Sequence, residues 1–333
     1  MRAVVLVGGF GTRLRPLTND LAKQMLPVVR VPMIERVVAA LGSYGVTEAV
    51  LSLGYRPDAF IDAYPDGVCA GVVLHYAVEP DPLDTAGAVR FAALSAGIDD
   101  TFIVVNGDVL TDLNVAELWE FHKSHGAEGT IALTPVEDPS RYGVVPIDDN
   151  GRVIEFVEKP APGTAPTNWI NAGTYVLEPS VLDRIASDRK VSIERETFPA
   201  MVADESLFAL HSDAYWIDAG TPDTYLRAQL DLIDGIRANE IAVLPSDEID
   251  SSALVENSVL GADVVIGNGT IVRNSILMDG VTIGPGVRIH DSIIASGARV
   301  GPDSHISGLT VVGAGVEVPA QSELTGARLP ESD

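Results

Sequence analysis

Three glycines and an arginine follow the first apolar segment of the chain. Residues 3–7 are apolar and run into the string Gly-Gly-Phe-Gly-Thr-Arg at 8–13. Glycines at this spacing let backbone N–H groups approach a phosphate closely, and Arg13 places a fixed cation beside them. A dinucleotide fingerprint would need glycine in place of Leu14, and a Walker loop would need Gly-Lys-Ser/Thr. The string therefore predicts a phosphate loop of another type; a plain glycine turn is the structural alternative.

Two aspartates also stand at the ends of apolar runs. Asp108 follows the run at 102–105 through Asn106 and Gly107, and Asp218 follows the run at 214–217. A continuous apolar run such as 102–105 is typical of a strand buried on both faces. Ligands of open α/β sheets bind beyond the carboxyl ends of the strands, so Asp108 is predicted to lie where chemistry would occur. An isolated aspartate in such a place is more often a turn or cap residue.

The elements that position these residues alternate along the first 235 residues. Short β-rich runs at 3–7, 49–53 and 102–106 alternate with helical segments at 33–44, 84–96 and 114–124. Such alternation builds right-handed βαβ units on a mostly parallel sheet. We therefore expect an α/β domain with a Rossmann-like, mostly parallel sheet over residues 1–240. A helix at 222–238, capped by Thr221, should lead out of it.

The chain changes character after residue 240, where a 17-residue repeat begins. Related four-residue strings start at 257, 274, 291 and 308, and aliphatic residues recur about every six positions, at 260, 266, 277, 283, 289, 294, 300 and 306. This pattern is typical of a triangular parallel β-helix of hexapeptide-type repeats. We expect about four coils over 257–324, in a second domain at 241–333; irregular sandwich strands, the alternative, lack a fixed period. Stacked coils with open ends favour a homo-oligomer.

Composition excludes several classes of partner. The 333 residues include 22 Lys and Arg but 47 Asp and Glu, a net charge of −25. Nucleic acids and anionic membranes would be repelled by such a surface, so any phosphate ligand needs a locally basic pocket. The single cysteine, Cys69, excludes an internal disulfide and a thiolate cluster. All apolar runs are strand-sized, which predicts no membrane span and a cytoplasmic location.

The string at 6–18, with Lys23 and residues 25–28 after it, resembles the signature of the sugar-phosphate nucleotidyltransferases, or nucleoside-diphosphate-sugar pyrophosphorylases. Matching strings continue at 82–87, 106–108, 142–145, 158–160, 171–173, 192–194 and 216–222. The resemblance covers most of the chain and is greatest to the mannose-1-phosphate guanylyltransferases. It implies a nucleotidyltransferase sheet followed by a left-handed parallel β-helix. It also implies that a sugar 1-phosphate attacks the α-phosphorus of a nucleoside triphosphate, giving GDP-mannose, or a close analogue, from GTP and mannose 1-phosphate.

The resemblance also assigns roles to residues. Arg13 and Lys23 would be catalytic through their contacts with the triphosphate, and Asp108 and Asp218 would hold Mg²⁺, a cation that prefers carboxylate oxygens. Because a phosphate monoester is already ionised near neutral pH, the reaction needs no general base. The implied nucleotide-binding residues are Leu6, Gly8, Gly9, Gly11, Thr12, Arg13, Glu79, Asp84, Thr85, Gly87 and Asp108. The implied sugar-phosphate-binding residues are Asn106, Gly107, Gly143, Glu158, Lys159, Asn171 and Gly173.

The choice of base depends on Glu79. A carboxylate there can accept both N1–H and N2–H of guanine, whereas glutamine, frequent in relatives that use pyrimidine nucleotides, pairs with a pyrimidine. Glu79 therefore favours GTP, unless it is only an exposed loop residue. Two strings depart from the family: Ala22-Lys23-Gln24 replaces Pro-Lys-Pro, and Asp84 replaces a glycine. Both departures leave room for an altered nucleotide pocket or a sugar analogue.

Other interpretations stay open. The same reaction could use thymidine, uridine or adenosine triphosphate with glucose 1-phosphate. A catalytically silent regulatory subunit that binds a nucleotide sugar is a second class of function, although Arg13, Lys23 and both aspartates are present. His122 and His125 lie on a helix expected at the surface, and no carboxylate or cysteine is expected beside them. This argues against a metal site.

Overall fold

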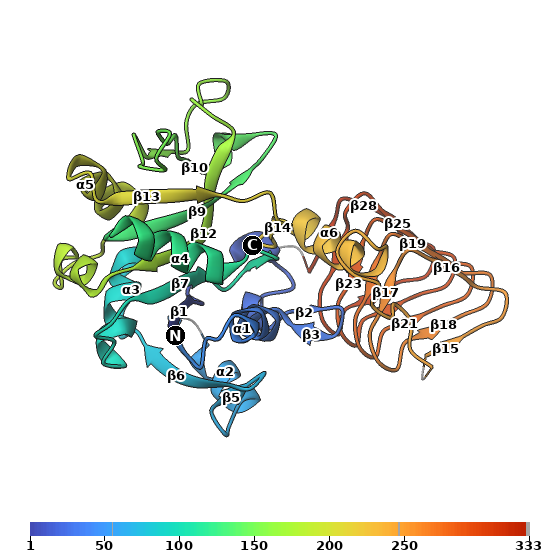
Figure 1. Ribbon diagram of the computed structural model, residues 1–333. Coiled ribbons are helices and arrows are strands. Elements are labelled where there is room, and N and C mark those ends of the chain that lie inside the picture. Colours follow the sequence, from blue (N-terminus) through green and yellow to red (C-terminus); the bar gives the residue numbers. More distant parts are fainter. Residues whose placement is uncertain (55, 246, 331–333) are drawn as a thin grey trace. The chain divides into compact units, whose positions relative to one another are not determined.

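A computed structural model of the chain describes residues 1–54, 56–245 and 247–330; residues 55, 246 and 331–333 of the two predicted domains lie outside it. The chain folds into two compact units (Figure 1). The first consists of Met1–Gly9 and Ile34–Trp216, and the second of Phe10–Met33 and Ile217–Asp333. The glycine-rich string is thus divided after Gly9, and its basic residues belong to the second unit. The predicted division of the chain at residue 240 stays a prediction.

The first unit is built on a ten-stranded mixed sheet, as the α/β prediction requires. Its strand order is β11-β10-β12-β7-β1-β4-β6-β5, and β9 joins both β12 and β13. The central strands β7, β1, β4 and β6 are parallel neighbours, whereas β12 runs antiparallel to β7. The ten strands are β1 (Arg2–Leu6), β4 (Glu48–Leu53), β5 (Val68–Cys69), β6 (Val72–Val78), β7 (Phe102–Asn106), β9 (Gly129–Pro135), β10 (Gly143–Val144), β11 (Val157–Glu158), β12 (Trp169–Leu177) and β13 (Leu207–His211).

Helices pack on this sheet through small or apolar faces. Helix α3 contacts β1, β4 and β6, and four of its buried residues are alanines, which lets the helix approach the sheet closely. The predicted helices at 33–44, 84–96 and 114–124 are confirmed to within one residue at each end. The elements are α1 (Met33–Ser43), α2 (Pro57–Ala63), α3 (Asp84–Ser95), α4 (Val115–His125) and α5 (Phe198–Ala203), with the short strands β8 (Val109–Thr111) and β14 (Trp216–Asp218).

Helix α4 differs from the prediction in one respect. His122 is fully buried, whereas it was expected on a surface without carboxylate company. Its Nδ1 lies 2.8 Å from Thr130 Oγ1 and its Nε2 lies 3.2 Å from Glu178 Oε1. Burial lowers the pKa of His122 despite the carboxylate, so the ring is a buried polar link between α4 and the sheet. Among the described residues, no group of three or more His, Cys, Asp or Glu side chains could hold a metal ion.

The second unit contains the predicted β-helix, which consists of three five-stranded parallel sheets. The first sheet comprises β15 (Glu248–Ile249), β18 (Val265–Ile266), β21 (Thr282–Ile283), β24 (Arg299–Val300) and β27 (Glu317–Val318). The second comprises β16 (Leu254–Glu256), β19 (Ile271–Arg273), β22 (Arg288–His290), β25 (His305–Ser307) and β28 (Glu323–Thr325). The third comprises β17 (Val259–Leu260), β20 (Ile276–Leu277), β23 (Ile293–Ile294), β26 (Val311–Val312) and β29 (Arg328–Leu329). All eight aliphatic residues predicted to face inward lie in its core.

Two details of the repeat prediction are wrong. The coils begin at residue 248 rather than 257, so each face has one more strand than four coils would give. The step from Ile293 to its partner Val311 is also 18 residues rather than the predicted 17, whereas the next step in that sheet, from Val311 to Arg328, is 17 again. One extra residue before Leu309 shifts the left-handed corner from 308 to 309, where Leu309 has φ 63°.

The remaining elements of the second unit are one helix and one hairpin. Helix α6 (Pro222–Ile233) begins at the predicted cap, since Thr221 Oγ1 accepts a hydrogen bond from the Thr224 N–H. It ends five residues before the predicted end, ahead of Gly235, which has φ 87°. The hairpin consists of β2 (Pro27–Val28) and β3 (Val31–Pro32). No helix among the residues described is long and apolar enough to cross a membrane.

Candidate active site

The carboxyl edge of the first unit's sheet brings four polar or predicted site positions into register. Leu6 at the end of β1 is level with Ser52 on β4 and with Asn106 on β7. Glu79 follows β6, and its Oε1 accepts a 2.9 Å hydrogen bond from Ser52 Oγ. Its Oε2 accepts a 3.1 Å hydrogen bond from the Leu83 N–H. Glu79 is therefore a half-buried, oriented carboxylate rather than an exposed loop residue.

Glycines keep this edge open to a ligand. Gly107 donates its N–H to Leu6 O, and a Cβ there would lie 2.7 Å from Val7 Cγ1. Gly9 has φ 101°, a conformation that side chains rarely adopt, while a Cβ at Gly8 would meet nothing within 4 Å. Asp108 follows Gly107 and is half-buried. The exposed backbone of Gly8 and Gly9 and the half-buried carboxylate of Asp108 thus both follow neighbouring parallel strands at this edge of the sheet.

The first turn of α3 carries three of the predicted nucleotide-binding residues. Asp84 has φ 63°, so it adopts the left-handed conformation that explains glycine at this position in the family. Its Oδ1 accepts a hydrogen bond from the Thr85 N–H at 2.8 Å. A Cβ on Gly87 would lie 2.8 Å from Leu83 Cβ, so the turn needs a glycine there. The aspartate therefore preserves the loop conformation and adds an exposed carboxylate to it.

The predicted sugar-binding residues of β12 surround a bulge in that strand. Asn171 Oδ1 accepts a 2.9 Å hydrogen bond from the Gly173 N–H, and its Nδ2 donates to Tyr175 Oη at 2.9 Å. Gly173 has φ 73°, and a Cβ there would lie 2.5 Å from Asn106 Nδ2. The glycine thus leaves space for the Asn106 amide. Asn106, Asn171 and Gly173 therefore form one polar cluster.

A second set of predicted sugar-phosphate residues lies on β10 and β11. Gly143 pairs with Glu158, and a Cβ on Gly143 would lie 2.6 Å from Phe156 Cζ and 3.2 Å from Glu158 Oε2. The Lys159 ammonium lies 3.0 Å from Glu158 Oε1 and remains largely exposed. The glycine thus leaves room for a carboxylate acceptor beside an exposed cation, a combination suited to a hydroxyl-bearing phosphate ester.

In the second unit, Gly11 lets the basic loop fold tightly on itself. Gly11 has φ 60°, and its carbonyl accepts a 2.8 Å hydrogen bond from Thr18 Oγ1. A Cβ at Gly11 would lie 3.2 Å from Lys23 Cβ. The exposed Thr12 begins a short 3₁₀ turn, Thr12–Leu14. Gln24, which replaces a family proline, is buried, and its amide has no hydrogen-bond partner among the residues described.

Side-chain atoms of Arg13 and Asp218 both lie close to Gly220 in the second unit. Asp218 Oδ1 accepts a 2.9 Å hydrogen bond from the Gly220 N–H. A Cβ on Gly220 would lie 2.7 Å from that oxygen and 2.9 Å from Arg13 Nη2. The glycine therefore lets a carboxylate and a guanidinium converge, the charges that a metal ion and a phosphate would each need.

Helix α6 and the β-helix hold this basic segment in place. Gln229 Oε1 accepts a 3.0 Å hydrogen bond from the Val29 N–H, and Arg30 Nη1 donates to Leu260 O at 2.8 Å. At the last coil, a Cβ on Gly313 would lie 3.2 Å from Pro16 Cβ. The β-helix thus contacts the segment at Pro16, between Arg13 and Lys23, and at Arg30, after Lys23.

The structure adds three residues whose roles the sequence did not reveal: Ser52, Tyr175 and Glu194. Ser52 is buried and orients Glu79, and the buried Tyr175 hydroxyl contacts Asn171. Glu194 belongs to the matching string at 192–194 and accepts a hydrogen bond from Thr85. That string was the one available signal, since nothing in the sequence links Ser52 or Tyr175 to the site.

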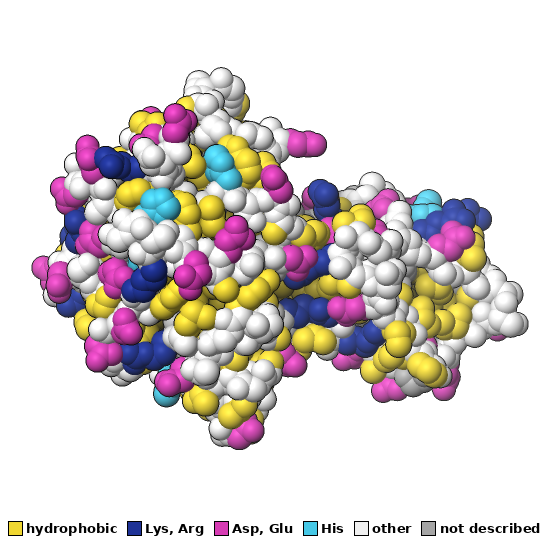
Figure 2. Space-filling model, viewed as in Figure 1, with side chains coloured by type: hydrophobic (Ala, Val, Ile, Leu, Met, Phe, Trp, Pro, Cys, Tyr) yellow, Lys and Arg dark blue, Asp and Glu magenta, His cyan; other side chains and the backbone are white. Residues whose placement is uncertain are grey.

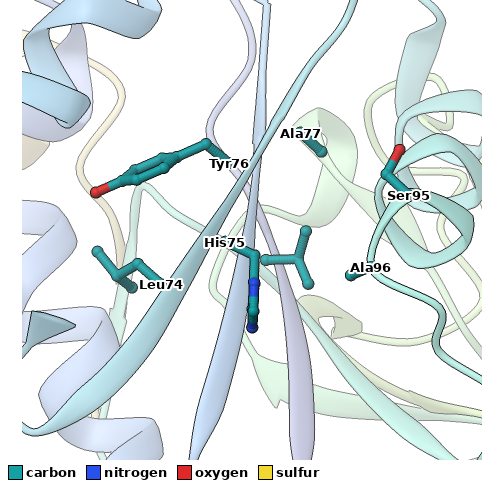
Figure 3. Close-up of a pocket in the computed structure, with 7 residues that line it drawn as sticks. Leu74, His75, Tyr76, Ala77, Ser95 and Ala96 are labelled. Atoms are coloured by element: carbon teal, nitrogen blue, oxygen red, sulfur yellow. The ribbon is translucent and has the colours of Figure 1, made fainter. Parts of the chain in front are cut away.

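One surface cavity lies away from these groups. It has a volume of about 320 Å³ and lies beside β6 and the end of α3 (Figure 3). None of the predicted site residues lines it; the lining residues are Val50, Leu74, His75, Tyr76, Ala77, Ser95 and Ala96. On the face shown in Figure 2, acidic side chains are spread over both units, so the basic residues of the site work against the general charge.

Comparisons with family models match nearly the whole chain. The model described as "Nucleotidyl transferase" matches residues 2–235, and "GMPPB C-terminal domain" matches residues 222–330. A mannose-1-phosphate guanyltransferase of Hypocrea jecorina is 47% identical over 232 residues, which cover 68% of this chain but only 62% of that protein. A probable mannose-1-phosphate guanylyltransferase 1 of Oryza sativa subsp. japonica is 42% identical over 273 residues, 80% of this chain and 75% of that protein.

A solved structure is similar as well. The crystal structure of HddC from Yersinia pseudotuberculosis matches with a TM-score of 0.60 and 32% sequence identity. The match covers 68% of this chain and 97% of that one. The similarity therefore extends over nearly the whole of that solved chain.

Proposed function

The chain belongs to the nucleotidyl transferase family, and from this we propose that it transfers a guanylyl group from GTP to mannose 1-phosphate. The products would be GDP-mannose and pyrophosphate. The names of the similar curated proteins support both substrates. The observation that carries the choice of GTP is the oriented carboxylate of Glu79 at the carboxyl edge of the sheet, because two acceptor oxygens fit N1–H and N2–H of guanine.

The reaction is a substitution at phosphorus. An oxygen of the sugar phosphate forms a bond to the α-phosphorus of GTP, and the bond between that phosphorus and the oxygen bridging to the β-phosphate breaks. Pyrophosphate leaves with the electron pair. Since the attacking oxygen is already ionised, the protein's tasks are to align the two esters and to offset their repulsion.

The basic residues of the second unit would offset this repulsion. We assign Arg13 and Lys23 to the triphosphate, with Gly8, Gly9, Gly11 and Thr12 supplying backbone N–H groups. The close approach of the Arg13 guanidinium to Gly220 supports its assignment, and the close approach of Lys23 Cβ to Gly11 places Lys23 at the tight loop. Each charge-assisted hydrogen bond to a phosphate would contribute about 1.5–3 kcal/mol.

Asp108 and Asp218 are the proposed ligands of Mg²⁺. The hard oxygens of the two carboxylates suit a small divalent cation, and each aspartate stands at a strand end, Asp108 after β7 and Asp218 as the last residue of β14. When bound, the ion would neutralise charge on the phosphates. The pairing of these two aspartates rests on the family resemblance.

The sugar phosphate would be bound in the first unit. Lys159 would contact its phosphate, while Glu158, Asn171 and the Gly143 backbone would hydrogen-bond its hydroxyls. The clustering of Asn106, Asn171 and Gly173 supports this role. We further propose that the chain acts in the cytoplasm as a homo-oligomer joined through its β-helix, whose end strands β15 and β29 each have one neighbour in their sheets.

A substrate panel tests the proposal. The chain is offered each of GTP, thymidine, uridine and adenosine triphosphates with mannose or glucose 1-phosphate, and pyrophosphate release is measured with Mg²⁺. We expect the highest kcat/KM with GTP and mannose 1-phosphate, and its loss in Asp108→Asn and in Asp218→Asn. Turnover only with a pyrimidine nucleotide would contradict the base assignment. If no substrate pair releases pyrophosphate but the chain binds GDP-mannose, the result would instead support a regulatory subunit.

A further inference from the structure

Glu194 lies between the loop of α3 and the sugar-binding cluster, all within the first unit. One of its oxygens, Oε2, accepts two hydrogen bonds, from Thr85 Oγ1 at 2.8 Å and from Ser192 Oγ at 2.8 Å. Thr85 Oγ1 in turn accepts a 2.8 Å hydrogen bond from the Ile193 N–H. Thr85 and the segment 192–194 therefore hold each other reciprocally.

Backbone hydrogen bonds extend this contact over the whole predicted nucleotide loop. The Val191 N–H donates to Leu83 O at 3.1 Å, and Val191 O accepts from the N–H groups of Ala86 and Gly87 at 2.9 and 3.3 Å. The first turn of α3 is thus attached to a segment more than 100 residues away in the sequence. The side-chain bonds of Glu194 fix Thr85, the second residue of that turn.

Tyr175 connects the segment of Glu194 with the sugar-binding cluster. This side chain is fully buried, and its hydroxyl accepts a hydrogen bond from Asn171. Burial raises the pKa of Tyr175 above its ordinary value, and the negative charges of Glu194 and Glu158 raise it further. The link is also geometric, because the Tyr175 ring packs edge-on against Phe198 with ring centroids 5.1 Å apart, and Phe198 directly follows the turn Ile193–Thr197 that carries Glu194. The turn that carries Glu194 therefore packs against the sugar-binding cluster as well as against Thr85.

We infer that Glu194 is a positioning residue, whose carboxylate fixes Thr85 and thereby aligns the nucleotide loop with the sugar-binding cluster. The inference rests on the proposed function, because it assumes that the loop contacts a nucleoside triphosphate. Its contribution is geometric: Glu194 acts through Thr85 and has no bond to make or break in the reaction.

A double-mutant cycle tests this inference. Glu194→Gln keeps the shape of the side chain but weakens its acceptor, and Thr85→Val keeps the shape of threonine without the hydroxyl. We expect each variant to raise the Kd for GTP, measured by calorimetry, and its KM about 10-fold, while kcat changes less than about threefold. The double variant should also show about a 10-fold effect, not the 100-fold effect of independent sites. The Kd for mannose 1-phosphate should stay within twofold.

A matched pair serves as the control. Thr101 donates to both oxygens of Glu178 at 2.8 and 2.9 Å, just before β7 and therefore at the opposite edge of the sheet from Asn106. Glu178→Gln and Thr101→Val should lower Tm without changing the Kd for GTP. Additive effects at Glu194 and Thr85, or a rise confined to the Kd for mannose 1-phosphate, would overturn the inference. If the wild-type chain binds GTP but releases no pyrophosphate, the proposed function fails while the binding cycle still decides the role of Glu194.

Discussion

At the scale of single residues, the site depends on how a few side chains are held. Glu79 is a clear case, because both of its oxygens accept hydrogen bonds and the side chain is oriented before any ligand binds. Preorganisation of this kind reduces the entropy lost on binding. The same reasoning applies to Gly220, where the absence of a side chain lets a cation and a carboxylate meet.

Glu79→Gln exchanges one carboxylate oxygen for an amide donor. We expect kcat/KM for GTP to fall about 10- to 100-fold, since a hydrogen bond to a charged group contributes about 1.5–3 kcal/mol. Activity with a pyrimidine triphosphate should rise relative to that with GTP. Glu48→Gln, on β4 but paired with the half-exposed His75, is the control. An unchanged preference among nucleotides would remove Glu79 from base recognition.

Gly220→Ala places a methyl group 2.7 Å from Asp218 Oδ1 and 2.9 Å from Arg13 Nη2, so one of them must move. Because displacements of about 1 Å can cost about 100-fold in rate, we expect kcat to fall by about that factor. Gly97→Ala is the control for stability, since it strains a φ of 60° in open space. Equal activity of the two variants at matched fraction folded would contradict the role of Gly220.

At the scale of elements, the β-helix is stabilised by a ladder along one left-handed corner. Asn257, Asn274 and Asp291 all have φ between 42° and 46°, which disfavours most side chains. Asn257 Nδ2 donates to Asn274 Oδ1 at 2.9 Å, and Asn274 Nδ2 donates to Asp291 Oδ1 at 3.1 Å. The corner thus uses the residue types that tolerate this conformation and can also bond between coils.

Asn274→Ala removes two ladder hydrogen bonds and leaves an unfavourable φ of 45°. We expect the free energy of unfolding to fall by about 1–3 kcal/mol, measured by denaturant titration. Asn274→Gly keeps the conformation accessible and loses only the ladder bonds, so it should cost less. Equal stability of Asn274→Ala and the wild type would show that the ladder contributes nothing.

The buried link between α4 and the sheet predicts a pH dependence. Burial lowers the pKa of His122, so below its ordinary value of about 6.5 the unfolded chain takes up a proton that the folded chain does not. The free energy of unfolding should therefore be highest above about pH 7. It should fall as the pH drops below about 6.5 toward the lowered pKa of His122. His122→Gln should abolish this component in denaturant titrations from pH 7.5 to 5.

The carboxylate of Glu178, in the same region, titrates in a lower pH range. Although burial opposes it, hydrogen bonds from Lys123, Thr101 and His122 lower the pKa of Glu178 below its ordinary 4.5. Its stabilisation is therefore lost only below about pH 4.5. If His122→Gln and the wild type lose stability equally between pH 7 and 5, then His122 is not the group responsible.

At the scale of the whole molecule, much of the fold could be predicted because it follows from local periodicity. The parallel strands, the helices and the repeating coils each have a pattern within 6 to 18 residues. The 18-residue step before Leu309 escaped prediction because one residue more or less barely changes the aliphatic pattern. His122 was misplaced because its partners, Thr130 and Glu178, come from other elements.

The candidate site shows the same limit. Gly11 could be predicted to matter, but the atoms it makes room for could not, and Gly220 was not singled out at all. The Thr85–Glu194 contact joins positions that are 109 residues apart in the sequence, so only the folded chain brings them together. The β-helix could likewise be predicted as an element, whereas its contacts with Pro16 and Arg30 needed the structure.

The central claim is that the chain joins a nucleotide to a sugar phosphate through a new diphosphate bond. The most direct test is ³¹P NMR of the purified chain with GTP, mannose 1-phosphate and Mg²⁺. The account predicts coupled diphosphate signals of GDP-mannose growing together with pyrophosphate, at equal rates and only with both substrates present. Release of inorganic phosphate without a new diphosphate signal, or no change at all in the spectrum, would contradict it.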